Sequence, residues 1–371
     1  MNFIPVNEPL LDGNEKKYLL DCIDTGWISS EGPYVSAFEK GFAAAVERKH
    51  GVAVSSGTAA LDTVIDAIGI KPGDEVIMPA FTIISCVGQI VRAGARPVLV
   101  DSDPLTWNMD VAQVERLVTS RTRAILVVHT YGLPVDLDPV LDVARRRGLI
   151  VIEDAAEAHG QTYRGRPCGS FGDLSVFSFY SNKHITTGEG GMILTEDADR
   201  AETCRSLRNL CFQAERRFVH ERLGWNLRMT NLQAALGLAQ LERLQEFVAR
   251  KRAMGARYQQ MLDGLPGVTM PLPRTDYADN VYWVYGMVLD EEAGLHAKEV
   301  MGRLATLGIG TRPFFCPMHQ QPVLRRAGLF EGESHPVAER LYQQGFYIPS
   351  GLALTEEQAI KVAEALWQVI G

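Results

Sequence analysis

Residues 153–191 hold side chains that could do chemistry together. Asp154 ends an apolar run, Ser178 and Lys183 follow it, and a glycine-rich turn at 187–191 completes the stretch. A lysine amine can form a Schiff base with an aldehyde, and a carboxylate can pair with a protonated pyridine nitrogen. This arrangement predicts a site for pyridoxal phosphate (PLP), in which Lys183 identifies the chemistry.

Asp154 has two possible roles. It follows the apolar run 149–152, which is predicted to be a strand. Ligands of parallel α/β sheets bind at the ends of strands, so the carboxylate could face a cofactor there. The alternative is a cap on a helix that begins at Ala155. The lysine downstream favours the cofactor.

Ser56, Gly57 and Thr58 follow another predicted strand and open a helix. Backbone amides at the N-terminus of a helix bind phosphate, and glycine allows the ligand to come close to the backbone. Ser178 could add a hydroxyl to the same phosphate. The alternative is an ordinary Ser/Thr cap, because the tetrapeptide alone is a weak signal.

Lys183 lies among small and polar residues, with glycines at 188, 190 and 191. An amine that forms an imine must be close to neutral at the working pH, and burial or a neighbouring cation can achieve this. The alternative is a solvated loop lysine.

Bulk composition limits the partners. The chain has 371 residues and a net charge of −8, which argues against nucleic acid. Six cysteines form no C-x-x-C pair, so we expect free thiols in a reducing compartment. No basic, apolar leader and no run of membrane length is present, so we expect a cytoplasmic protein without a membrane partner. The histidines show no metal-ligand spacing, so no metal is expected.

Short apolar runs alternate with helical patterns through the first two thirds of the chain. This alternation predicts an α/β domain with a mainly parallel sheet. The predicted strands are 51–55, 75–78, 97–100, 124–128 and 149–152. Residues 229–262 then have the pattern of one long helical region, and a smaller α+β part follows. We expect a large cofactor-binding domain over 1–245 and a small domain over 246–371.

Together these motifs resemble the DegT/DnrJ/EryC1/StrS family of sugar aminotransferases, which are PLP enzymes of fold type I. The resemblance spans nearly the whole chain. Its motifs are WISS at 27–30, SGTAAL at 56–61, GDEVI at 73–77, EDAAEA at 153–158, FSF at 177–179, NK at 182–183, TGEGG at 187–191 and RMTN at 228–231.

The resemblance implies roles for individual residues. Lys183 would hold PLP covalently, Asp154 would face the pyridine nitrogen and Glu157 would lie near the phenolic oxygen. Asn226 would reach the phosphate of a second subunit, which implies a homodimer with shared sites. The matching cofactor positions are Ser56, Gly57, Thr58, Ile83, Asp154, Glu157, Ser178 and Asn226. The candidate substrate positions are Ser29, Arg312 and His319, for which a surface or interface position is the alternative.

Two departures from the family pattern stand out. Family members usually have an aromatic residue that stacks on the cofactor where this chain has Ile83, so either Ile83 covers the ring or Phe81 shifts in. The segment 211–218 lacks the Gly-Gln-Gly of the branch that the chain otherwise resembles most. This segment lies near the substrate in the family, so the sugar nucleotide could differ.

The resemblance implies transfer of an amine from glutamate to a nucleotide-linked 4-keto-6-deoxyhexose. The branch that the chain resembles most uses GDP-4-keto-6-deoxymannose. The alternatives are a UDP- or dTDP-linked keto sugar, a PLP-dependent sugar 3-dehydratase, and a ligand-binding regulator without turnover. The dehydratase branch carries histidine at the position of Lys183, which argues against that alternative.

Overall fold

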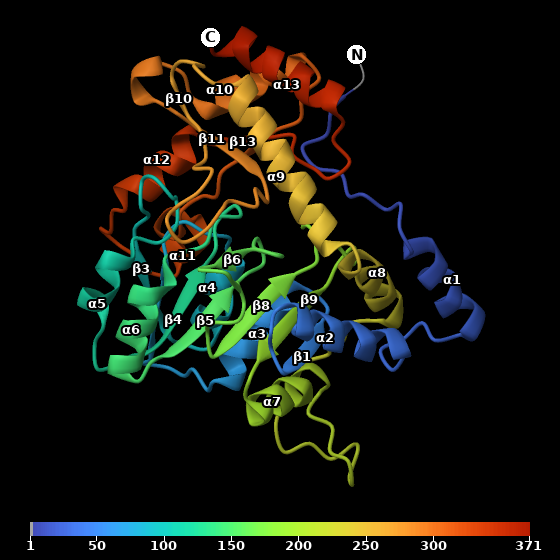
Figure 1. The fold of residues 1–371 in the computed structure, drawn as a ribbon. Coiled ribbons are helices and arrows are strands. Elements are labelled where there is room, and N and C mark those ends of the chain that lie inside the picture. The colour runs from blue at the N-terminus through green and yellow to red at the C-terminus, as the bar shows by residue number, and fades with distance from the viewer. Residues whose placement is uncertain (1–2) are drawn as a thin grey trace.

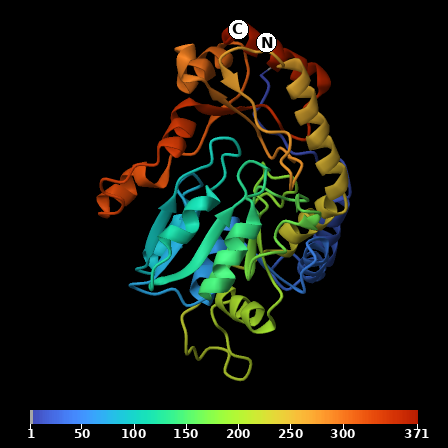
Figure 2. The same cartoon turned by 60° about the vertical axis from the view of Figure 1, so that its left-hand side comes forward.

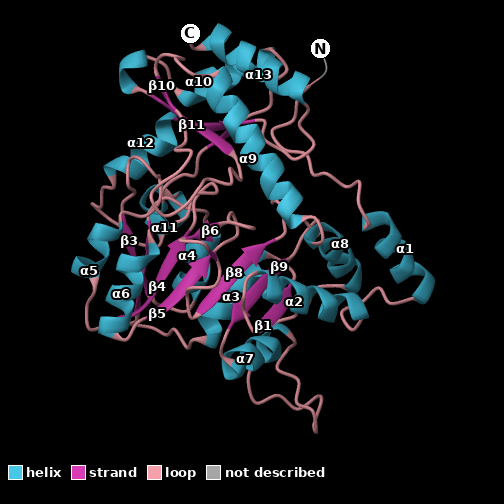
Figure 3. Cartoon of the chain, viewed as in Figure 1, coloured by secondary structure: helices cyan, strands magenta, loops and turns pink. Residues whose placement is uncertain are grey.

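The structure is a computed structural model that describes residues 3–371. Its largest feature is a seven-stranded sheet (Figure 1, Figure 3). The strands in spatial order are β1 (His50–Val54), β9 (Gly191–Thr195), β8 (Leu174–Ser178), β5 (Ile150–Asp154), β4 (Thr122–Val128), β2 (Glu75–Pro79) and β3 (Arg96–Val100). Among these strands β9 alone runs in the direction opposite to the other six. The prediction of a mixed, mainly parallel sheet is therefore confirmed.

Both faces of this sheet are apolar and covered by helices. Side chains of a strand alternate between the faces, and in β4 the side chains of Leu126 and Val127 enter two different cores. The first face packs against α3 (Gly57–Ala67), α4 (Ser85–Arg92) and α7 (Ala198–Arg208). The second face packs against α2 (Pro33–Ala45), α6 (Leu137–Arg147) and α8 (Asn231–Leu241). Burial on both faces explains why the strands are continuous apolar runs in the sequence.

A smaller unit contains a four-stranded antiparallel sheet. Its order is β10 (Val268–Thr269), β11 (Tyr285–Leu289), β13 (Gly345–Ile348) and β12 (Arg312–Pro313). The core of this unit includes residues of α9 (Leu244–Met261), α10 (Ala297–Thr306) and α13 (Glu356–Val369). Ile4 also belongs to this core and pairs with Ile309, so the N-terminal segment lies on the smaller unit (Figure 1). The smaller α+β unit is as predicted, and the domain boundary at residue 245 stays a prediction.

The predicted helical region 229–262 is two helices, α8 and α9. A capping box between Thr230 and Gln233 starts α8, which packs on α1 (Glu15–Thr25) and α2. Arg243 lies at the break and pairs with Asp12 and Glu246. Beyond the break α9 runs along one side of the molecule to the smaller unit (Figure 1, Figure 2). The apolar spacing continues across the break, and for this reason the sequence pattern did not reveal it.

The remaining elements are short. They are α5 (Val114–Leu117), α11 (Pro322–Arg326), α12 (Pro336–Gln344), the 3₁₀ turns Val111–Gln113, Glu291–Ala293 and Met318–Gln320, and a hairpin of β6 (Thr162–Tyr163) and β7 (Arg166–Pro167). All six cysteines are free thiols, as expected. Within residues 3–371, every helix is too short or too polar to cross a lipid bilayer.

Candidate active site

A cavity of about 370 Å³ lies where the carboxyl ends of β1, β5 and β8 meet. The smaller unit closes it with the aromatic side chains of Trp283, Phe315 and Tyr347. Most of the predicted cofactor positions line this one cavity: Ser56, Gly57, Thr58, Ile83, Asp154, Glu157, Ser178 and Lys183. The fold thus brings together residues that are far apart in the sequence, because strands that run in one direction end at one edge.

Lys183 lines this cavity, and its side chain is only 10% exposed. Its Nζ lies 3.6 Å from Oε1 of Glu157 and 3.8 Å from the centre of the Trp283 ring. Burial lowers the pKa of Lys183, although the carboxylates of Glu157 and Asp154 oppose this shift. The amine is therefore easier to deprotonate than a surface lysine, as reaction with an aldehyde requires. The alternative of a solvated loop lysine is not what the structure shows.

Asp154 and Glu157 are both buried carboxyl groups. Oδ1 of Asp154 accepts a hydrogen bond from the amide of Ala156 at 3.0 Å, and Oδ2 faces the thiol of Cys86 at 3.4 Å. Burial raises the pKa of Asp154 and raises that of Glu157 to about 7. A thiol is a weak donor, so Oδ2 retains the capacity to accept a bond from a ligand N–H.

The N-terminus of α3 forms the opposite end of the cavity. A Cβ on Gly57 would lie 2.7 Å from Cβ of Ser178, so only glycine allows this approach. The first amides of the helix lack acceptors within the helix and can bind an anion. The hydroxyl of Thr58 lies 2.8 Å from that of Ser85, the first residue of α4. The hydroxyl of Ser56 caps α3 by accepting from the amide of Ala59, so the capping alternative holds for this side chain.

The wall beside Lys183 distinguishes between the two alternatives for position 83. Ile83 lines the cavity and is 45% exposed, whereas Phe81 is fully buried against Tyr131. The aliphatic residue, and not a shifted Phe81, therefore lies where a ring could be covered. Sequence reasoning missed Trp283, which lies two residues before β11.

The remaining predicted residues lie outside this cavity. Ser29 lines a second cavity of about 780 Å³, which also contains Arg205, Arg208, Arg217 and Arg228. Asn226 is exposed. Arg312 is exposed on β12, opposite Tyr347 of the cavity wall. His319 is only 1% exposed and contacts Glu339 at 2.9 Å, so this conformation gives its predicted substrate contact no support.

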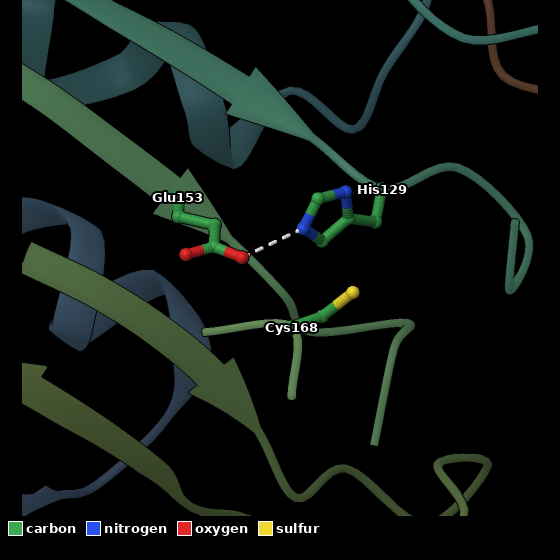
Figure 4. A group of neighbouring side chains, drawn as sticks. All are labelled: His129, Glu153 and Cys168. Carbon is green, nitrogen blue, oxygen red and sulfur yellow. Dashed lines mark hydrogen bonds and ion pairs between the residues drawn. The ribbon is translucent and has the colours of Figure 1, made fainter. Parts of the chain in front are cut away.

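His129, Glu153 and Cys168 form a buried cluster (Figure 4). Nδ1 of His129 accepts from the amide of Val135, so Nε2 carries the proton and donates to Glu153 at 2.9 Å. The carboxylate also accepts bonds from the backbone amides of 169, 171 and 172. Burial raises the pKa of the Cys168 thiol, which disfavours the thiolate that a metal needs. Hydrogen bonding explains the cluster without a metal ion.

Glu153 should stabilise the strand end that carries Asp154. Burial pushes the pKa of Glu153 upward, but hydrogen bonds from His129 and backbone amides outweigh it and lower that pKa. We expect Glu153→Gln to reduce the free energy of unfolding at pH 7 by about 3 kcal/mol. The stabilisation by ionised Glu153 is fully present above the pKa of about 4.3 that a glutamate has in the unfolded chain. It is lost as the pH falls through the lower pKa that Glu153 has in the folded protein. Urea unfolding of the wild type and Glu153→Gln at pH 7 and at pH 3 measures the difference in the free energy of unfolding and its dependence on pH. A difference of the same size at the two pH values would contradict the prediction.

These groups fit PLP. The cavity offers an amine for the aldehyde, a buried carboxylate whose Oδ2 is bonded only by a weak thiol donor and can accept from the pyridine nitrogen, and helix amides beside Ser178 for the phosphate. The glycine at 57 lets this helix end lie directly against Ser178, so the helix amides and the hydroxyl are close together.

The chain matches the DegT/DnrJ/EryC1/StrS aminotransferase family over residues 9–367 and belongs to it. It is a PLP-dependent aminotransferase, so the predicted family, enzyme class and cofactor are confirmed.

Individual relatives are similar over almost their full length. The chain is 46% identical to the GDP-perosamine synthase of Caulobacter vibrioides, covering 99% of this chain and 98% of that one. It is 40% identical to the GDP-perosamine synthase of Escherichia coli O157:H7, with the same coverage. Among solved structures, the aminotransferase TlmJ from Streptoalloteichus hindustanus superposes with a TM-score of 0.91 at 31% identity, covering 98% of both chains. The PLP form of Spr1654 from Streptococcus pneumoniae gives 0.91 at 25% identity, covering 99% and 98%.

Proposed function

We propose that this aminotransferase moves an amine from glutamate to the 4-keto carbon of GDP-4-keto-6-deoxymannose. The observation that carries the proposal is the 46% identity to a GDP-perosamine synthase over 99% of this chain. The cavity around Lys183 supplies the groups that such a transfer needs.

Three charged residues of the cavity each have a different role in the reaction. PLP, when bound, withdraws electrons from the carbon that carries the amine and makes its hydrogen acidic. Lys183 binds the cofactor and, once released, takes and returns a proton through Nζ at the carbon that loses or gains the amine. Asp154 keeps the pyridine nitrogen protonated. Glu157, with its pKa raised to about 7, can hold a proton beside the phenolic oxygen. Both half-reactions share this site, so ping-pong kinetics are expected.

The phosphate group of PLP is assigned to the N-terminus of α3. The amides of Gly57 and Thr58 point from the first turn of the helix, and Ser178 lies against Gly57. Four arginines line the second cavity around Ser29. Arg205 and Arg208 pair with Glu202 and Glu39, so Arg217 and Arg228 are the candidates for binding a nucleotide diphosphate.

A homodimer completes the site in this proposal. Asn226 lies outside the cavity of its own chain, and the segment beside it exposes large apolar side chains. Phe218 is 80% exposed and Leu223 is 91% exposed. Exposure of this kind marks a surface that another protein covers. A second copy would bury these side chains and bring its Asn226 to the phosphate.

A mixing experiment tests the shared site. Lys183→Ala and Asn226→Ala are each expected to lose activity at limiting PLP. After mixing and subunit exchange, half of the dimers are mixed and one of their two sites is intact, so about one quarter of wild-type activity should return. A wild-type sample taken through the same exchange is the control. A mixture no more active than the sum of its parents would place Asn226 in its own chain's site.

The substrate assignment is tested with a panel of GDP-, UDP- and dTDP-linked 4-keto-6-deoxy sugars and glutamate. The amino product is detected by its mass, with Lys183→Ala as the blank. We expect product from the GDP-linked mannose derivative. Product from a UDP- or dTDP-linked sugar alone would replace the GDP assignment and would point to segment 211–218 as the reason.

A further inference from the structure

Trp283 has a fixed position against the reactive amine. Its side chain is 4% exposed, and Nζ of Lys183 lies 3.8 Å from the centre of its ring. A cation this close to an indole face is attracted by the ring quadrupole, and the attraction is strongest for tryptophan and for desolvated cations. The contact is therefore of the kind that stabilises a buried ammonium.

One hydrogen bond holds the indole, and a second holds the backbone of Trp283. Nε1 of Trp283 donates to the carbonyl of Asn182 at 2.8 Å, so the ring is tied to the residue before Lys183. The carbonyl of Trp283 accepts from Nζ of Lys251 in α9 at 2.8 Å, and Lys251 also donates to the carbonyl of Ser350. These bonds link the indole to both units of the fold and leave it little freedom to move away from the amine.

We propose that the indole face of Trp283 is a further catalytic element, which holds the ammonium of Lys183 whenever that amine is not joined to the cofactor. The inference rests on the proposed role of Lys183 as cofactor-binding amine and proton carrier. Between the two half-reactions that amine must stay near the carbon that exchanges a proton.

Glu157 lies 3.6 Å from the amine and Asp154 is a second carboxylate that attracts it, but these two groups alone would hold the amine less firmly near neutral pH. Burial raises the pKa of Glu157 to about 7, so its negative charge is incomplete near neutral pH. The indole does not titrate in this range, so the ring attracts the amine at every pH at which Lys183 is protonated. Trp283 thus keeps the amine in place when Glu157 is protonated, and Glu157 adds to the attraction when it is ionised.

The test measures the protonation of Lys183 in cofactor-free protein, with no sugar substrate. Trp283→Leu removes the ring, and Trp283→Phe keeps a weaker ring. Acetylation of Lys183 by trace acetic anhydride is followed by peptide mass spectrometry across pH, with the exposed Lys361 as internal reference. Only the neutral amine reacts with the anhydride, and loss of the ring should lower the pKa of Lys183. At a fixed pH below that pKa, the acetylation rate of Lys183 should therefore rise by about tenfold in the leucine variant. The phenylalanine variant should lie between it and the wild type.

The shape of the pH profile separates protonation from access. A shift of the midpoint to lower pH in the order Trp, Phe, Leu supports the proposal. Unchanged midpoints, or a rate raised equally at every pH, would overturn it. If the leucine variant does not fold, the midpoint of Trp283→Phe decides alone. A wild-type Lys183 that forms no adduct with PLP would instead overturn the proposed role of the lysine.

Discussion

Lys183→Ala is expected to reduce turnover by about 10⁴-fold or more, because a positioned proton carrier alone contributes up to about 10⁴. The same substitution removes the covalent bond to the cofactor. The buried carboxylate and the N-terminus of α3 remain, so PLP should still bind without a covalent link. The loss is measured as kcat with glutamate and the keto sugar. Borohydride reduction followed by mass spectrometry should attach PLP to residue 183 in the wild type only.

Two controls accompany this variant. Lys183→Arg keeps a positive charge against Trp283 and Glu157 but cannot form the covalent bond, so it should be as inactive as the alanine variant. Lys361→Ala removes an exposed lysine on α13 and should retain full activity. Wild-type rates in a purified Lys183→Ala protein would rule out the assigned chemistry.

Much of the large sheet could be predicted because its physical cause is local. Strands that are buried on both faces must be apolar throughout, as in β4, and such runs are visible in the sequence. Asp154 and Ser178 each end a strand of this sheet, and their meeting follows from the common direction of these strands. The break between α8 and α9 was missed because residues on both sides continue the apolar spacing.

The rest of the site depends on packing between distant segments. Trp283 and Tyr347 reach the cavity only because the smaller unit lies over the edge of the large sheet. No periodicity in the sequence encodes this docking. The position of Ser29 in a second cavity and of Asn226 on the surface has another origin, if the site is shared between two copies as proposed.

Asp154→Asn should reduce kcat by about 10²–10³, the usual cost of losing one preorganised electrostatic partner of the transition state. The amide has nearly the shape of the carboxyl, so the bond from the amide of Ala156 can persist and the fold should be kept. What is lost is the negative charge that keeps the pyridine nitrogen protonated. Circular dichroism and PLP stoichiometry should match the wild type while single-turnover rates fall. Cys86→Ser retains a donor opposite Oδ2 and is the matched control, with an expected change of less than about tenfold. Equal rates for Asp154→Asn and wild type would show that the ring nitrogen has another partner.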